Sequence, residues 1–102
     1  MTGRFDILDD HRMLTQLVQE REFVALVEYV MQKAEQAGDL KNYIQSVILG
    51  EDFLRWLYLA RTSRGEQQLE YYREMKRALR GLFELIGDIH QYAIIKNQLS
   101  QK

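Results

Sequence analysis

Two histidines, His11 and His90, are the first residues of this 102-residue chain to consider for chemistry, because histidine exchanges protons and binds metals near neutral pH. His11 follows Asp6, Asp9 and Asp10, a grouping with the composition of a hard-metal cluster. Carboxylates at the start of a helix also cap free backbone N–H groups and oppose the positive end of the helix dipole. We therefore interpret this group as a helix start, with Asp9 or Asp10 as the N-cap, and expect no metal site.

His90 projects from the centre of an apolar stripe, near Ile86 and Ala93. A single histidine in such a stripe is typical of a core or interface residue whose ring has a hydrogen-bond partner. The alternative is a pH-sensitive contact, since burial disfavours the charged form of histidine.

The remaining residue types argue against an enzyme. The chain has no cysteine, which excludes a disulfide scaffold, a thiolate zinc site and a cysteine nucleophile. The six glycines are isolated, and no nucleophile elbow, phosphate loop, dinucleotide-binding or zinc-ligand spacing occurs. We expect no catalytic residue, no metal and no cofactor, and no motif points to a particular family.

Three arginines, Arg73, Arg77 and Arg80, share one face of a predicted helix, with Lys76 beside them. Such a face can follow the phosphate backbone of DNA or RNA. The alternative is a solvated face on which acidic residues three or four positions away neutralise the arginines. These acidic residues are Glu70, Glu74 and Glu84.

The region 40–62 is apolar on two faces, which is typical of a helix at the centre of a bundle or buried against a partner chain. One stripe contains Leu40, Tyr43, Ile44, Val47, Leu54 and Tyr58. The second stripe contains Leu49, Phe53, Trp56 and Ala60. Because aromatic anchors are enriched at interface centres, we predict that this second stripe forms an interface; the alternative is that another helix of the same chain covers it.

Few signals break the chain, and they define the elements that position these residues. Proline is absent, which favours long helices. Gly38 followed by Asp39 predicts a helix stop and a new N-cap, and the run from 62 to 65 predicts a second break. The segments are then 9–37, 40–62 and 65–98. The apolar face of the first segment rotates near residues 20–22, which predicts a further break there and so a fourth helix.

The last segment has a heptad-like stripe, and its length matters. The stripe consists of Tyr72, Met75, Leu79, Leu82, Ile86, Ile89 and Ala93. A helix over 65–98 would reach about 50 Å, longer than a compact domain of this size. We expect it either to bend at Gly81 or Gly87, or to extend beyond its own domain and be covered by a second copy. Gly50 predicts a bend in the helix over 40–62.

Charge is unevenly distributed along the chain, and uncharged runs are short. Residues 1–52 carry 5 basic and 10 acidic side chains, a balance of −5, whereas residues 53–102 carry 9 and 5, a balance of +4. The longest uncharged run, 42–50, is far shorter than the roughly 20 residues of a membrane span, and 1–6 lacks the apolar stretch of a secretory signal. We therefore expect a cytoplasmic protein without membrane contact.

The sequence thus predicts one all-α domain over 1–102, a compact bundle of three long or four helices with a short flexible lead (1–6) and tail (99–102). The expected function is a non-enzymatic protein–protein interaction or assembly module, an adaptor or regulator that forms a homodimer and binds another protein. The alternative is a DNA- or RNA-binding regulator that uses the arginine face.

Overall fold

The computed structural model describes residues 7–100, which form four helices and no strand. The helices are α1 (Ile7–Gln19), α2 (Phe23–Ala37), α3 (Leu40–Thr62) and α4 (Gly65–Ser100). The all-α prediction is confirmed, with four helices. The expected lead and residues 101–102 lie outside the described residues, whereas Leu99 and Ser100 continue α4 and do not begin a tail.

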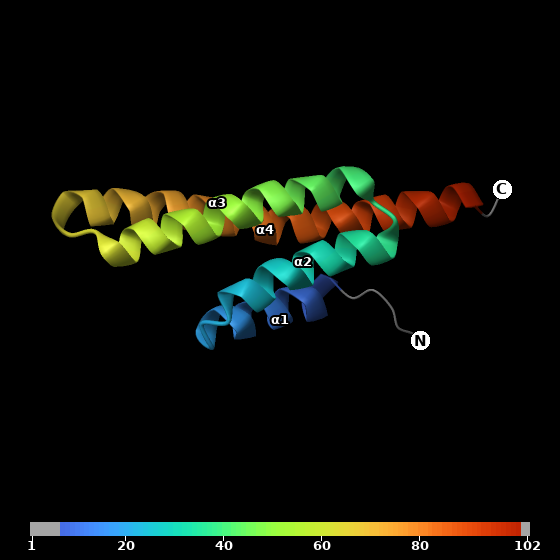
Figure 1. The fold of residues 1–102 in the computed structure, drawn as a ribbon. Helices are drawn as coiled ribbons and strands as arrows, with labels where there is room; N and C mark the ends of the chain where they lie inside the picture. The colour runs from blue at the N-terminus through green and yellow to red at the C-terminus, as the bar shows by residue number, and fades with distance from the viewer. Residues whose placement is uncertain (1–6, 101–102) are drawn as a thin grey trace.

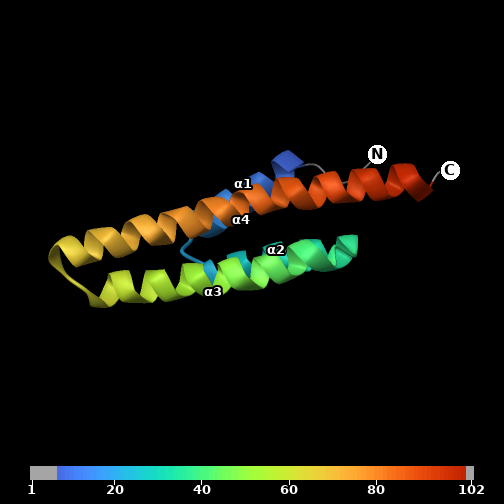
Figure 2. The same ribbon diagram turned by 90° about the horizontal axis from the view of Figure 1, so that it is seen from above.

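The helices form two antiparallel hairpins that lie against each other. Figure 1 shows the shorter α1–α2 hairpin beneath the longer α3–α4 hairpin, and Figure 2 shows that α1 lies under α4 and α2 under α3. Accordingly α1 contacts α2 and α4, while α2 contacts both α3 and α4. The bundle is elongated, with extents of 57 × 24 × 16 Å, because α4 runs its whole length.

Local sequence signals set the helix ends. Gly38 adopts the left-handed conformation (φ 71°) that ends α2, and its N–H and that of Asp39 bond to carbonyls of the last turn. The side chain of Asp39 then accepts a hydrogen bond from the backbone N–H of Asn42, which caps α3 as predicted. The predicted break between α1 and α2 is also confirmed, with Arg21 at φ 58°.

The glycines expected to bend helices do not interrupt them. The longest helix, α4, continues through both Gly81 and Gly87, and α3 continues through Gly50. Gly50 instead permits a close approach between helices, because a β-carbon built there would clash with Cγ1 of Val27 on α2. The absent side chain thus lets α2 and α3 pack closely.

The core lies where the two hairpins meet, and the heptad-like stripe of α4 contributes to it as predicted: Leu82, Ile86 and Ile89 are buried. They join a cluster that also contains Leu14, Leu26, Val27, Val30, Ala34, Phe53, Ala78 and Leu85. Among the helices of the described region, none has the length and apolar character needed to cross a membrane.

Candidate functional site

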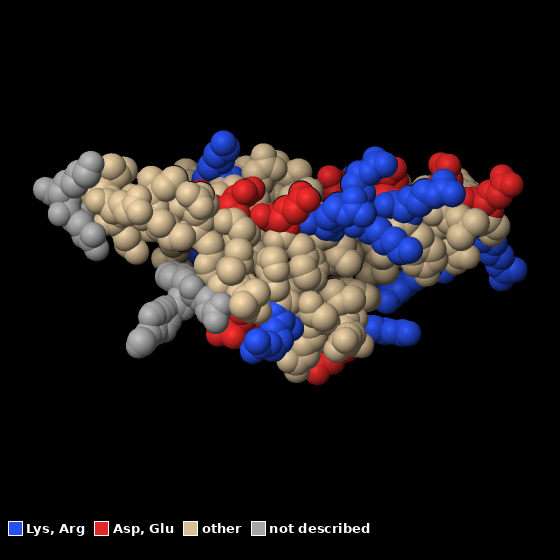
Figure 3. Space-filling model, turned by 180° about the vertical axis from the view of Figure 1, so that it is seen from behind, with Lys and Arg blue, Asp and Glu red and all other residues tan. Residues whose placement is uncertain are grey.

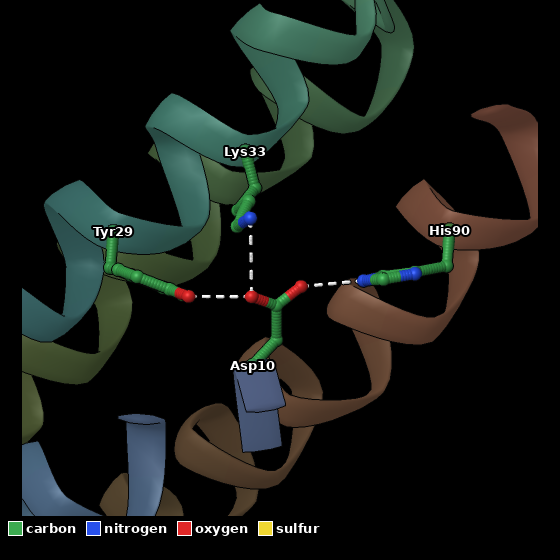
Figure 4. A network of polar contacts seen from close by, with 4 residues as sticks. All are labelled: Asp10, Tyr29, Lys33 and His90. Carbon is green, nitrogen blue, oxygen red and sulfur yellow. Dashed lines mark hydrogen bonds and ion pairs between the residues drawn. The ribbon is translucent and has the colours of Figure 1, made fainter. Parts of the chain in front are cut away.

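Four polar side chains from three helices meet around the carboxylate of Asp10 (Figure 4). The hydroxyl of Tyr29 donates to Oδ1 at 2.5 Å, and Nζ of Lys33 lies 3.2 Å from the same oxygen. Nε2 of His90 lies 2.5 Å from Oδ2. Because an ionised carboxylate only accepts hydrogen bonds, Nε2 of His90 carries the proton in this contact. Both oxygens of Asp10 therefore have partners.

Ordinary helix spacing brings this network together. Tyr29 and Lys33 are four residues apart and share one face of α2. Asp10 comes from the first turn of α1 and is only 3% exposed, while His90 comes from α4 and is 8% exposed. A carboxylate buried to this degree requires such partners, since an unpaired buried charge is strongly unfavourable.

The prediction that this group marks a helix start is confirmed, because Asp9 and Asp10 lie in the first turn of α1, but the predicted N-cap role is wrong. Because α1 already includes Ile7, both residues lie inside the helix and neither precedes it. Asp9 is exposed and pairs with Arg12 at 3.2 Å, and Asp10 points into the protein interior. Asp6 lies outside the described residues. The expectation that His90 is a buried residue with a hydrogen-bond partner is confirmed.

The surroundings shift two pKa values in opposite directions. Burial raises the pKa of Asp10, but the hydrogen bonds from His90, Tyr29 and Lys33 together outweigh burial and hold this pKa below its ordinary value of 3.8. Burial and the hydrogen bond to the Asp10 carboxylate raise the pKa of Tyr29 well above its ordinary value of 10.0. At neutral pH the carboxyl group is thus ionised and the phenol is neutral.

This arrangement holds a charge in place and gives each oxygen of the buried Asp10 carboxylate at least one partner. Within residues 7–100, no three His, Asp or Glu side chains are grouped to hold a metal ion. The ring of the other histidine, His11, lies 6.0 Å from that of Phe83, and its Nε2 has no hydrogen-bond partner among the residues that the structure describes. We interpret the Asp10 network as a set of polar contacts that holds α1 against α2 and α4.

The arginines predicted to contact nucleic acid lie on the exposed side of α4, and Figure 3 shows Lys and Arg gathered on that face of the molecule. Arg73 lies 3.7 Å from Glu70, and Arg77 lies 3.4 Å from Glu74, so acidic neighbours offset both charges. Arg80 makes no ion pair with another residue of the described region.

Other helices of the same chain cover the predicted interface residues of α3, some fully and some only in part. Phe53 and Ala60 are fully buried. Phe53 packs edge-on against Phe23 of α2 with 5.5 Å between ring centroids, and the carbonyl of Ala60 accepts a hydrogen bond from Gln68 of α4. These two residues therefore belong to the chain's own core, and the prediction that they face a partner is corrected.

The other two predicted interface residues are only half-buried. The ring of Trp56 lies 5.7 Å from that of Tyr71 on α4, and the guanidinium group of Arg55 lies over the Trp56 ring, 5.6 Å from its centroid. Leu49 packs against the core and lies beside Gly81 of α4. Both side chains thus face α4 of the same chain, and part of each remains accessible.

Two further groups of apolar side chains are open to solvent. Leu40, Ile44 and Ile48 follow one another at intervals of four on the outer face of α3. Ile94, Ile95 and Leu99, called here the apolar end of α4, are 51%, 46% and 65% exposed. The sequence predicted Leu40 and Ile44 as part of one of two apolar stripes and did not single out Ile48. It did not single out Ile95 and assigned Leu99 to a flexible tail.

The last contacts of α4 with the rest of the chain are polar. The hydroxyl of Tyr92 donates to the carbonyl of Gly38, which follows α2, and Nζ of Lys96 donates to the carbonyl of Ala37, the last residue of α2. Beyond this point α4 extends past the neighbouring helices (Figure 1). The expected projection of the last helix beyond its own domain is confirmed.

Comparisons of the chain with models of known families, with curated proteins and with solved structures found no match.

Proposed function

We propose that this chain is a small, non-enzymatic protein–protein interaction module that assembles as a homo-oligomer. The observation that carries this proposal is the apolar end of α4, where Ile94, Ile95 and Leu99 remain about half exposed or more. Contiguous exposed apolar surface of this kind is typical of protein interaction sites.

Burial of these side chains would favour association. Transfer of an aliphatic side chain from water into an interface is worth about 1.5–3 kcal/mol when burial is complete. The outer face of α3, with Leu40, Ile44 and Ile48, offers further apolar surface for a partner. A symmetric dimer would use the same surface twice, so one patch on each copy is sufficient.

The test is the mass of the protein in solution, measured by light scattering during gel filtration. We expect the native chain to be larger than a monomer at high micromolar concentration and Ile95→Lys to shift it toward the monomer. The matched control is Val24→Lys, which changes an exposed apolar residue on α2 and leaves α4 intact. A native chain that is monomeric at high micromolar concentration overturns the proposal.

The second candidate is a DNA- or RNA-binding regulator that uses Arg73, Arg77 and Arg80. The exposed basic side chains on α4 favour it, Arg80 in particular because no acidic residue of the described region pairs with it. Binding of this kind weakens steeply with salt, because neutralised phosphates release counterions. Gel retardation with duplex DNA and single-stranded RNA at low and raised salt tests it, and no retardation at low salt contradicts it.

A further inference from the structure

Four charged residues of α4 form a column at intervals of four: Lys76, Arg80, Glu84 and Asp88. All four are exposed. Residues four apart lie on one ridge of a helix, so the order of charges along this ridge is positive, positive, negative, negative. When a second copy of the helix lies antiparallel to the first, each positive residue of one copy lies opposite a negative residue of the other.

None of these four side chains has an ion-pair partner among residues 7–100. Neighbouring arginines on α4 do have partners, since Arg73 pairs with Glu70 and Arg77 with Glu74. The sequence predicted that Glu84 would neutralise an arginine in the same way, but the ion pairs formed by the described residues do not include it. The column therefore carries charges that residues 7–100 leave unmatched.

We propose that this column is the contact between two copies of the chain, with α4 packed antiparallel to α4 of the partner subunit about a twofold axis that passes midway between Arg80 and Glu84 on the exposed face of α4. In this register Arg80 faces Glu84 of the partner subunit, and Lys76 faces Asp88 of the partner subunit. The inference rests on the proposed function, homo-oligomeric assembly, and adds the surface and the direction of the partner.

Apolar residues extend the same register at both ends. Leu69, which is 58% exposed, lies as far from Leu82 on one side as Ile95 lies on the other. The antiparallel arrangement therefore places Leu69 opposite Ile95 of the partner subunit. Apolar contacts at the two ends provide affinity, while the central charges fix register and direction.

The charges also exclude the competing parallel arrangement. A parallel partner in register would place Arg80 opposite Arg80 and Glu84 opposite Glu84, and such like-charge contacts are unfavourable. Figure 3 shows the face concerned, with basic side chains over the half of the molecule near the α3–α4 turn, acidic ones beside them, and mainly uncharged surface toward the C-terminal end.

Charge reversal tests this register on the full chain. Arg80→Glu alone, or Glu84→Arg alone, makes the column largely one sign, and we expect each variant to dimerise at least about tenfold more weakly than the native chain at low ionic strength. When the two variants are mixed, each supplies the charge that the other lacks, so a heterodimer forms. The double variant Arg80→Glu/Glu84→Arg regains self-complementarity and dimerises. Sedimentation equilibrium gives the dissociation constants, and far-UV circular dichroism confirms that each variant is folded.

The control is Arg73→Glu, which makes the same change of charge on the same exposed helix but faces Gln91 of the partner subunit in this register. We expect it to weaken dimerisation far less than Arg80→Glu. If the native chain dimerises and the two reversals neither weaken dimerisation nor restore it when mixed, the register is wrong and the proposed function stands. If the native chain is monomeric at high micromolar concentration, both the register and the proposed homo-oligomeric function are wrong. A native monomer that binds nucleic acid and loses this binding in Arg80→Glu overturns the inference in favour of the nucleic-acid role.

Discussion

Nε2 of His90 and Oδ2 of Asp10 lie 2.5 Å apart, although 80 residues separate them in the sequence. The contact joins α1, the first helix, to α4, the last. Because Lys33 and Tyr29 of α2 bind the other oxygen of the same carboxylate, three helices depend on one side chain.

Asp10→Asn should therefore destabilise the fold severely. The amide removes the charge that balances Lys33 and places a donor where only an acceptor fits, so we expect a loss of about 3 kcal/mol in the free energy of unfolding, measured with urea. Asp9→Asn is the matched control, since Asp9 is exposed, and it should cost about 0.5 kcal/mol or less. Equal effects of the two variants would show that the network contributes nothing to stability.

Low pH should remove the stabilisation that the ionised Asp10 carboxylate provides. The pKa of Asp10 is lower in the folded chain than its ordinary value of 3.8, so the folded state binds fewer protons than the unfolded state in this range. The stabilisation is complete only above about pH 5, roughly one unit above the ordinary pKa of the unfolded chain, and is lost as the pH falls through the folded pKa. The difference in stability between the native chain and Asp10→Asn should thus be constant near neutral pH and shrink in acid. A difference that does not shrink at any acidic pH at which the native chain is still folded contradicts this.

Two glycines in helix interiors should respond oppositely to alanine. Alanine favours a helix over glycine by about 1 kcal/mol, but at Gly50 its β-carbon would clash with Val27, and such overpacking costs about 1–3 kcal/mol. We expect Gly50→Ala to lower the melting temperature. At Gly87 the nearest atom, Cδ1 of Ile7, would be 3.8 Å from the new β-carbon, which is an ordinary van der Waals contact. Gly87→Ala should therefore raise the melting temperature. A stabilising Gly50→Ala would disprove the close approach of α2 and α3.

The arginine face should be dispensable for folding. The ion pairs of Arg73 and Arg77 are exposed and three residues apart, and pairs of this kind contribute about 0.3–0.5 kcal/mol each. Replacing Arg73, Arg77 and Arg80 together by glutamine should change the melting temperature little, as measured by circular dichroism, and should abolish nucleic-acid binding if the chain has that function. A large loss of stability would mean that these side chains are not on the surface.

The three breaks between the helices could be predicted because local residues determine them. Gly38 provides the left-handed conformation, Asp39 provides the cap, and both act within a few residues of their own position. The break near Arg21 was visible because the apolar face rotates there. These signals do not require knowledge of which helices meet.

The side-chain partners could not be predicted, because they depend on how the hairpins lie against each other. Asp10 has the same local signature as an N-cap, and only the positions of α2 and α4 show that it is buried. On α3, apolar on two faces, the sequence did not show which face the chain itself covers. Phe53 and Ala60 were assigned to a partner and are buried, whereas Leu40 and Ile44 of the other stripe are exposed.

The hairpin arrangement also has a kinetic consequence. α3 and α4 are neighbours in sequence and make the most extensive contact between any two helices, so this hairpin closes only a short loop and should form early. Docking of α1 on α4, by contrast, brings together segments near opposite ends of the chain. It should therefore form last and open first in the native state, so backbone amides of α1 should exchange with deuterium well before those at the centre of α3 and α4.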